Sequence, residues 1–196
     1  MAARKRAAVP ETITAAEYTR LVAGLSTRYT SNRRMRAMLA LMYLAGLRCG
    51  EVCALESGSI DLQGRSVTVP HVDGLTKTGG RRVGLMPSVT LDSALQEWEA
   101  VRDTSSPYYF HTNAGGRVDT SQVRRRLAQV ATAAGLPHVH PHTLRHSWAR
   151  NALAAGVPIN AVQSALGHAD LATTMVYTRL SEQQQIDTLA HTPAGL

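Results

Sequence analysis

The spacing of apolar residues changes between residues 59 and 85 and then changes back. Inside this stretch apolar and polar residues alternate, whereas on either side the apolar residues recur every three or four positions. Alternation is typical of a half-buried strand, and the longer period is typical of an amphipathic helix. The turn sequences 63–64 and 76–80 divide the alternating stretch into three runs, around 60–62, 67–69 and 83–85. The sequence therefore predicts a mainly α fold with a small three-stranded antiparallel β-sheet.

Capping signals place several of the helices. Thr14 lies three residues before Glu17, which predicts a capping box and a helix through about Leu25. We expect Ser31 or Asn32 to cap the next helix, and Thr120 to cap one that ends at Gly135. Further helices are expected over 48–55, 87–101, 141–156 and 158–166, with a weak one over 181–196. In the 141–156 helix the expected buried stripe consists of Leu144, Trp148, Ala152 and Ala155.

Charge and length suggest a single domain with a polyanionic partner. The chain has 196 residues, with 21 Lys and Arg against 14 Asp and Glu, so its formal charge is +7. Such a balance favours nucleic acid as a partner through counterion release. Residues 1–10 read as a basic flexible arm, and 11–196 as one domain. The arginine run 124–126 is compatible with a contact to a DNA backbone and equally with a solvated helix face.

Other classes of protein are disfavoured by the sequence. No apolar run approaches the about 20 residues that span a bilayer, and the first residues lack a secretory signal, so we expect a cytoplasmic protein without a membrane partner. Cys49 and Cys53, four residues apart in one helix, are expected to be buried reduced thiols. His142 and His146 have the spacing of a zinc-protease pair, but Thr143 stands where that motif needs glutamate, so no metal site is expected.

Four segments carry a more specific signal through their order and spacing. They are AGLRCGEV (45–52), LTKTGGRRVGLMP (75–87), HPHTLRHSWARNALAAGV (140–157) and LGHADLATTMVYTRL (166–180). Together they resemble the phage integrase, or tyrosine recombinase, family, over about residues 14–180. The resemblance implies the catalytic-domain fold of that family. It leaves no room for the amino-terminal core-binding domain of most members, which we expect to be absent, as in the short fimbrial-switch type recombinases.

The resemblance also implies a reaction and a set of catalytic residues. Tyr177 would attack a DNA phosphate and form a covalent 3′-phosphotyrosine bond, which needs neither a metal nor another cofactor. Arg48 and Arg145 would clamp the phosphate, and Lys77 would protonate the departing hydroxyl. The full expected catalytic set is Arg48, Lys77, His142, Arg145, His168 and Tyr177. Glu51 would orient Arg48 and a buried His146 would support the motif, while Arg81, Arg124, Arg125 and Arg126 are the candidate DNA contacts.

The expected function is site-specific recombination: integration, excision or inversion of double-stranded DNA. The resemblance implies a homotetramer assembled on DNA, close to the nucleoid, and an accessory DNA-binding protein is a further conceivable partner. Two alternatives remain at this point. One is an enzyme like topoisomerase IB, which nicks and reseals one duplex. The other is a non-enzymatic DNA-binding accessory protein, although such a protein would not need all six catalytic side chains.

Overall fold

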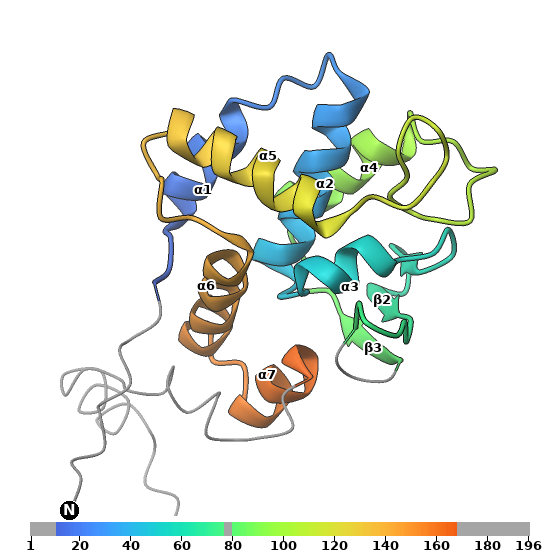
Figure 1. Ribbon diagram of the computed structural model, residues 1–196. Coiled ribbons are helices and arrows are strands. Elements are labelled where there is room, and N and C mark those ends of the chain that lie inside the picture. The colour runs from blue at the N-terminus through green and yellow to red at the C-terminus, as the bar shows by residue number, and fades with distance from the viewer. Residues whose placement is uncertain (1–10, 77–79, 168–196) are drawn as a thin grey trace, which may run out of the picture.

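The computed structural model describes residues 11–76 and 80–167, arranged as helices beside one small sheet (Figure 1). The expected basic arm 1–10, the helix over 181–196, and Lys77, His168 and Tyr177 lie outside these residues. The helices are α1 (Ala15–Ala23), α2 (Thr30–Leu44), α3 (Cys49–Ala54), α4 (Val89–Glu99), α5 (Thr120–Ala133), α6 (Pro141–Ala154) and α7 (Ile159–Leu166). The strands are β1 (Ile60–Asp61), β2 (Ser66–Val69) and β3 (Arg81–Gly84).

Helix α2 lies at the centre of the hydrophobic core. It packs against α4 on one side and α6 on another, and its methionines Met35, Met38 and Met42 are buried. From Ala37 to Tyr43 every residue of α2 is buried and apolar, since a helix covered on several sides has no broad solvent face there. A smaller cluster between α6 and α7 includes Trp148 and Leu166. The two clusters fix α6, and so the residues that it carries, against both α2 and α7.

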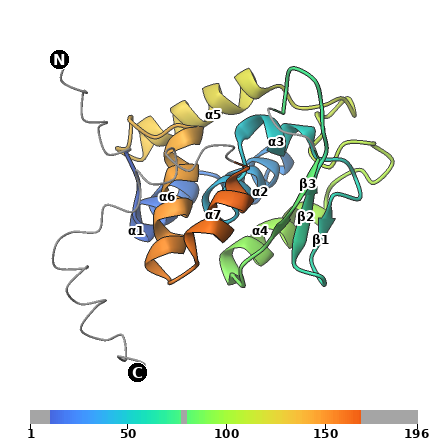
Figure 2. The ribbon, with the colours of Figure 1, turned by 90° about the horizontal axis from the view of Figure 1, so that it is seen from below.

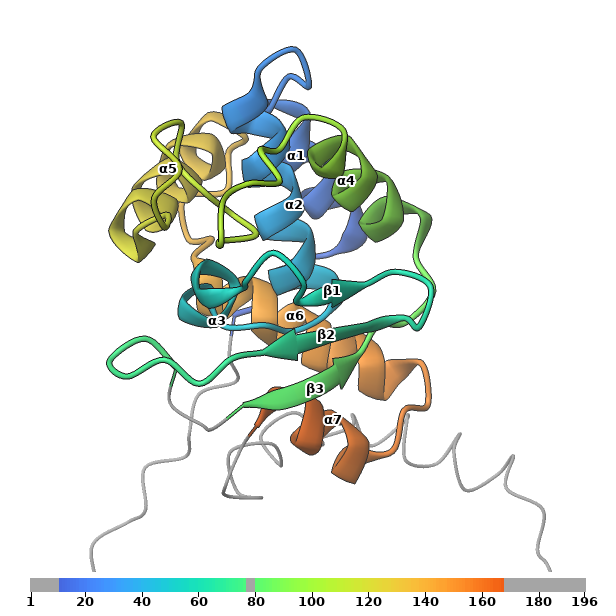
Figure 3. The same cartoon turned by 90° about the vertical axis from the view of Figure 1, so that its right-hand side faces the viewer.

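The sheet lies at one side of the helical body (Figure 2). Its strands are antiparallel in the order β1-β2-β3, with Ile60 opposite Val67 and Val67 opposite Val83. The buried residues Val67, Val69 and Val83 face the core, whereas Thr68 is exposed, which is the alternation that the sequence indicated. Beyond β3 the sheet borders α7 (Figure 3). The predicted mainly helical fold with a three-stranded antiparallel sheet is confirmed.

Some helix boundaries agree with the sequence and others differ. Thr14 and Glu17 form the expected capping box, with the Glu17 carboxylate accepting from the Thr14 amide at 2.8 Å. The expected caps of α2 were wrong: the helix begins at Thr30, and Tyr29 precedes it without a side-chain cap. Asn32 instead lies inside the helix and donates to the carbonyl of Ser26 at 3.1 Å. Its side-chain oxygen accepts from Arg126 of α5 at 3.2 Å, so the side chain is no longer available for capping.

Two more expectations need correction, and one is confirmed. Helix α5 is capped by Asp119, whose carboxylate accepts from the Ser121 amide at 2.6 Å, so Thr120 is its first residue. Ala155 is exposed, because α6 ends at Ala154 and the buried stripe ends at Ala152. Cys49 and Cys53 are both buried free thiols, as expected. No helix within the described ranges has the length and apolar character that crossing a membrane would require.

Candidate active site

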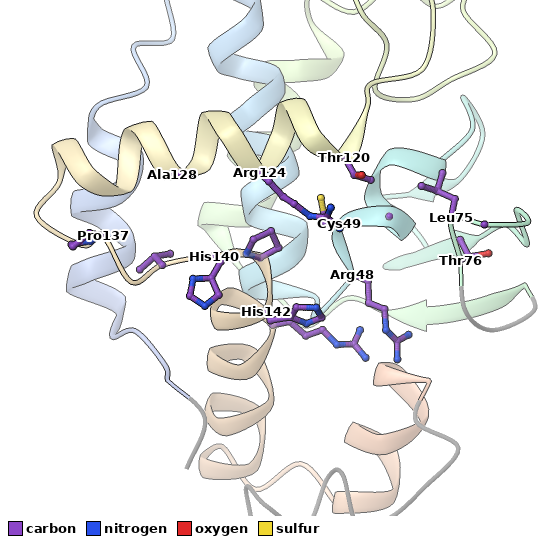
Figure 4. Close-up of a pocket in the computed structure, with 15 residues that line it drawn as sticks. Arg48, Cys49, Leu75, Thr76, Thr120, Arg124, Ala128, Pro137, His140 and His142 are labelled. Carbon is purple, nitrogen blue, oxygen red and sulfur yellow. The ribbon is translucent and has the colours of Figure 1, made fainter. Parts of the chain in front are cut away.

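A pocket of about 750 Å³ opens between α3, α5, the start of α6 and the loop that follows β2. Its lining combines basic side chains with small and apolar ones. Figure 4 shows Arg124 reaching from α5 toward Cys49, and Arg48 extending from the start of α3 toward the end of α7. The residues that line it include Arg48, Cys49, Gly50, Leu75, Thr76, Arg124, His140, His142 and Arg145.

Glu51 organises the arginines at this pocket. Its side chain has no solvent exposure, and both of its oxygens accept hydrogen bonds. The Arg48 amide donates to Oε2 at 2.7 Å, and Arg48 Nη1 donates to Oε1 at 2.8 Å. Arg81 donates from Nη1 to Oε1 at 2.7 Å and from Nη2 to Oε2 at 2.9 Å. Arg145 Nη1 lies at 3.8 Å from Oε2. One buried carboxylate thus holds three guanidinium groups around it.

The charge of Glu51 follows from these contacts. Burial by itself raises the pKa of the carboxyl, but the hydrogen bonds from Arg81 and from the Arg48 amide outweigh it and lower the pKa to about 2. Glu51 is therefore ionised at neutral pH. The ionised carboxylate is paired with Arg48, the residue that the sequence analysis expected it to orient.

Arg145 is more deeply buried than Arg48, with a side chain only 4% exposed. Its Nη1 donates to the carbonyl of Gly46 at 2.7 Å, and its Nη2 donates to the carbonyl of Leu166. Arg48 is 19% exposed, and its Nη2 lies at 3.4 Å from the carbonyl of Gly167. Both guanidinium groups therefore sit between α3, α6 and the end of α7 in fixed orientations and border the pocket.

Two glycines allow these elements to approach closely. Gly46 has a φ of +69°, and a Cβ there would lie 2.4 Å from the Trp148 ring. A Cβ on Gly50 would lie 2.4 Å from the carbonyl oxygen of Leu75. The first contact seats the α2–α3 turn on α6, and the second seats the loop after β2 on α3. The glycine of the GLR motif is thus required by packing as well as by backbone geometry.

The chain segments next to two expected catalytic residues lie at this site. Thr76 is buried and lines the pocket; its hydroxyl accepts from the Val72 amide at 2.8 Å and fixes the loop that leads to position 77. Gly167, with a φ of +60°, ends α7 directly before position 168. The expected catalytic residues Lys77, His168 and Tyr177 themselves lie outside the described residues. Of the expected set, the structure brings together Arg48, His142 and Arg145.

The two histidines of α6 lie side by side, with ring centroids 6.1 Å apart. His142 is exposed and lines the pocket, whereas His146 is half-buried rather than fully buried as expected. Partial loss of solvation and the neighbouring cations lower the pKa of His142, and burial is the main cause that lowers the pKa of His146 to about 4. Both imidazoles are thus neutral at pH 7. Within 11–76 and 80–167, no third ligand joins them in a group that could hold a metal ion.

The candidate DNA contacts do not form one surface. Arg124 lines the pocket, while Arg125 and Arg126 border a second depression of about 450 Å³ between α2 and α5. Arg81 is turned inward onto Glu51, a partner that the sequence analysis missed. Thirty positions separate these two residues, and no local pattern links them. Contact of any of these arginines with DNA stays a prediction.

Known proteins are similar to this chain in sequence and in fold. The model of the phage integrase family matches residues 11–184. A tyrosine recombinase XerC of Xanthomonas campestris pv. campestris (strain B100) is 38% identical over 179 residues, which cover 89% of this chain and 53% of that protein. A XerC of Corynebacterium efficiens is 36% identical over 158 residues, or 79% of this chain and 49% of that one. This chain therefore spans about half the length of these relatives.

Solved structures agree with the family match. The crystal structure of XerA recombinase superposes with a TM-score of 0.74 at 30% identity, covering 94% of this chain and 67% of that chain. The Tn1549 transposon integrase in complex with a circular intermediate DNA gives a TM-score of 0.76 at 16% identity, covering 96% and 68%, which shows the shared fold. The fold, the motif order and the family match together show that this chain belongs to the phage integrase family.

Proposed function

We propose that this protein is a site-specific recombinase that cuts and rejoins double-stranded DNA through a covalent 3′-phosphotyrosine bond at Tyr177. The observation that carries the proposal is the pairing of Arg48 and Arg145 around buried Glu51 at the edge of an open basic pocket. Two fixed guanidinium groups bordering one cavity suit the non-bridging oxygens of a phosphodiester, whose charge grows in the transition state. Membership of the phage integrase family supports the same reaction.

In the proposed reaction the Tyr177 oxygen attacks the phosphorus, and the bond from phosphorus to the 5′ oxygen breaks. The tyrosine loses one proton and the departing 5′ hydroxyl gains one, so the step is balanced without an external reagent. His142, neutral at pH 7, can accept the first proton, and Lys77 would donate the second. His168 would hydrogen-bond the phosphate. The phosphotyrosine bond conserves the energy of the broken ester, so the reverse step reseals DNA.

The proposed partner is duplex DNA, in a homotetramer assembled on it. Exchange between two duplexes requires four strand cuts and therefore four tyrosines. The net charge of +7 and Arg124 at the pocket favour a polyanion. Among proteins of the same fold, XerH has been solved bound to its difH substrate before and after cleavage.

The test uses purified protein with nicked, end-labelled duplexes taken from the DNA around its own gene. A nick close to the cut site lets the cleaved fragment diffuse away, so a covalent adduct accumulates and survives denaturation. We expect the adduct with wild-type protein and none with Tyr177→Phe. Tyr29→Phe, at an exposed tyrosine that precedes α2, is the matched control and should form the adduct normally.

Other outcomes point to other functions. An adduct together with relaxation of supercoiled DNA, but without recombinant junctions, would indicate an enzyme like topoisomerase IB. DNA binding without any adduct, or a Tyr177→Phe variant with full biological effect, would indicate a non-enzymatic accessory protein. If chemical cross-linking of the protein on a cleaved substrate gives species no larger than dimers, that result would contradict the proposed tetramer.

A further inference from the structure

Arg81, the first residue of β3, faces the interior of the site. Its side chain is only 14% exposed and forms a two-pronged pair with Glu51, at 2.7 and 2.9 Å. Its Nε and Nη2 also lie at 3.4 and 3.3 Å from the carbonyl of Ala165, near the end of α7. Because its guanidinium group contacts both Glu51 and Ala165, the Arg81 side chain connects the sheet, α3 and α7. It therefore presents little charge to an approaching duplex.

The pair between Arg81 and Glu51 limits what the other two arginines can do. Glu51 Oε2 already accepts from Arg81 Nη2 and from the Arg48 amide, while Arg145 Nη1 stays at 3.8 Å from the same oxygen. Arg145 Nη1 donates instead to Gly46. Without Arg81, the carboxylate would have free acceptor capacity, and Arg48 and Arg145 would be the nearest cations to fill it.

The end of α7 also rests on the Arg81 guanidinium. A Cβ placed on Gly167 would lie 3.2 Å from Arg81 Cζ, and the Gly167 carbonyl is the group that Arg48 Nη2 approaches. Arg81 therefore packs against the same turn that Arg48 contacts. Displacing its guanidinium would disturb both sides of the clamp together.

We infer that Arg81 is a positioning residue of the proposed reaction: by occupying Glu51 and the end of α7, it sets how far Arg48 and Arg145 reach into the pocket. This inference rests on the proposed function, because the clamp matters only if a phosphate binds there. It differs from the DNA contact that the sequence suggested for Arg81. A direct contact would strengthen binding, whereas a positioning residue acts on the rate once DNA is bound.

The test compares Arg81→Gln and Arg81→Lys with Arg82→Gln. Arg82 is the matched control, because it is the next residue of β3, is 65% exposed, and bonds to Ser66 at 2.9 Å on the outer face. Single-turnover cleavage of the nicked duplex is measured at saturating DNA, and Kd for DNA is measured by fluorescence anisotropy. Thermal unfolding of each variant reports whether it folds.

We expect Arg81→Gln to slow cleavage about 100-fold at saturating DNA, as small misplacements of catalytic groups do. Its Kd should change no more than that of Arg82→Gln. Arg81→Lys keeps the charge but loses the two-pronged geometry, and should cleave at an intermediate rate. The double variant Glu51→Gln/Arg81→Gln should be no slower than Glu51→Gln alone, because Arg81 acts through that carboxylate.

Several results would overturn the inference. If Arg81→Gln cleaves at the wild-type rate but binds DNA more weakly, Arg81 is a DNA contact. If the losses of cleavage rate add up in the double variant, Arg81 acts independently of Glu51. If Arg81→Gln does not fold, Arg81→Lys decides: a folded variant at the wild-type rate refutes the inference. If wild type and Arg81→Gln cleave at equal rates, the inference about Arg81 is refuted but the proposed function is not. No cleavage by wild type refutes the proposed function and, with it, the role of Arg81.

Discussion

Glu51 is a single buried carboxylate with which three arginines of the site form ion pairs. A carboxylate without solvent exposure is stable only because Arg48 and Arg81 donate to it and Arg145 stands close by. These three cations would repel each other if the carboxylate were absent. The residue thus stabilises the fold and orders the arginines around it at the same time.

Replacing Glu51 by Gln should lower the free energy of unfolding at pH 7 by about 3 to 5 kcal/mol, since it leaves buried charges without their partner. The native pKa is lowered from 4.5 to about 2, so the stabilisation is complete above pH 4.5 and is lost as the pH falls toward 2. Urea unfolding of both proteins between pH 7 and pH 3 measures this.

The difference in the free energy of unfolding between wild type and Glu51→Gln should therefore become smaller below pH 4.5. A difference in the free energy of unfolding that stays constant down to pH 3 would show that the carboxyl is not held ionised by its arginines. Glu56→Gln, at an exposed glutamate, is the control and should stay within about 0.5 kcal/mol of wild type.

At the scale of elements, the α2–α3 turn decides where Arg48 and Arg145 meet. The Gly46 carbonyl accepts a hydrogen bond from Arg145, and Arg48 follows two residues later at the start of α3. The turn is pressed against α6 by the contact of Gly46 with Trp148. Its geometry therefore links the arginine of one motif to that of another 97 positions away in the sequence.

Gly46→Ala should destabilise the protein for two reasons. A left-handed backbone costs a residue with a Cβ about 1 to 2 kcal/mol, and crowding against Trp148 adds about 1 to 3 kcal/mol. Gly135→Ala separates the two terms, because Gly135 has a φ of +71° but no atom near its Cβ position. Urea unfolding should show the larger loss for Gly46→Ala, and equal losses would mean that the Trp148 contact relaxes freely.

At the scale of the whole molecule, the positive charge is divided between the pocket and other faces. Arg124 lines the pocket, whereas Arg125 and Arg126 border the depression between α2 and α5, and Arg81 is enclosed. A duplex over the pocket would therefore meet these arginines unequally. The salt dependence of binding measures such differences, since each neutralised phosphate releases counterions.

Arg124→Gln should reduce the slope of log K against log salt by about 0.9, the value for one phosphate contact. Anisotropy titrations of a labelled duplex at several salt concentrations measure this slope. Arg28→Gln, at an exposed arginine between α1 and α2 that does not line the pocket, should leave the slope unchanged. An unchanged slope for Arg124→Gln would exclude a phosphate contact at that position.

Local sequence determined much of the fold. The period of the apolar residues gave the helices and the three strands, and Thr14 with Glu17 gave the start of α1, because these signals act over a few residues. The motifs identified Arg48, His142 and Arg145, which do meet at one pocket. Lys77, His168 and Tyr177 remain predictions from those motifs.

Tertiary structure alone decided the rest. It turned Arg81 onto Glu51, left His146 half-buried, and separated Arg124 from Arg125 and Arg126. It also paired Asn32, inside α2, with Arg126 of α5. Each of these outcomes depends on which element packs beside the residue, often tens of positions away in sequence. Periodicity specifies which face of an element is buried, but the partner on that face is set only when the elements pack together.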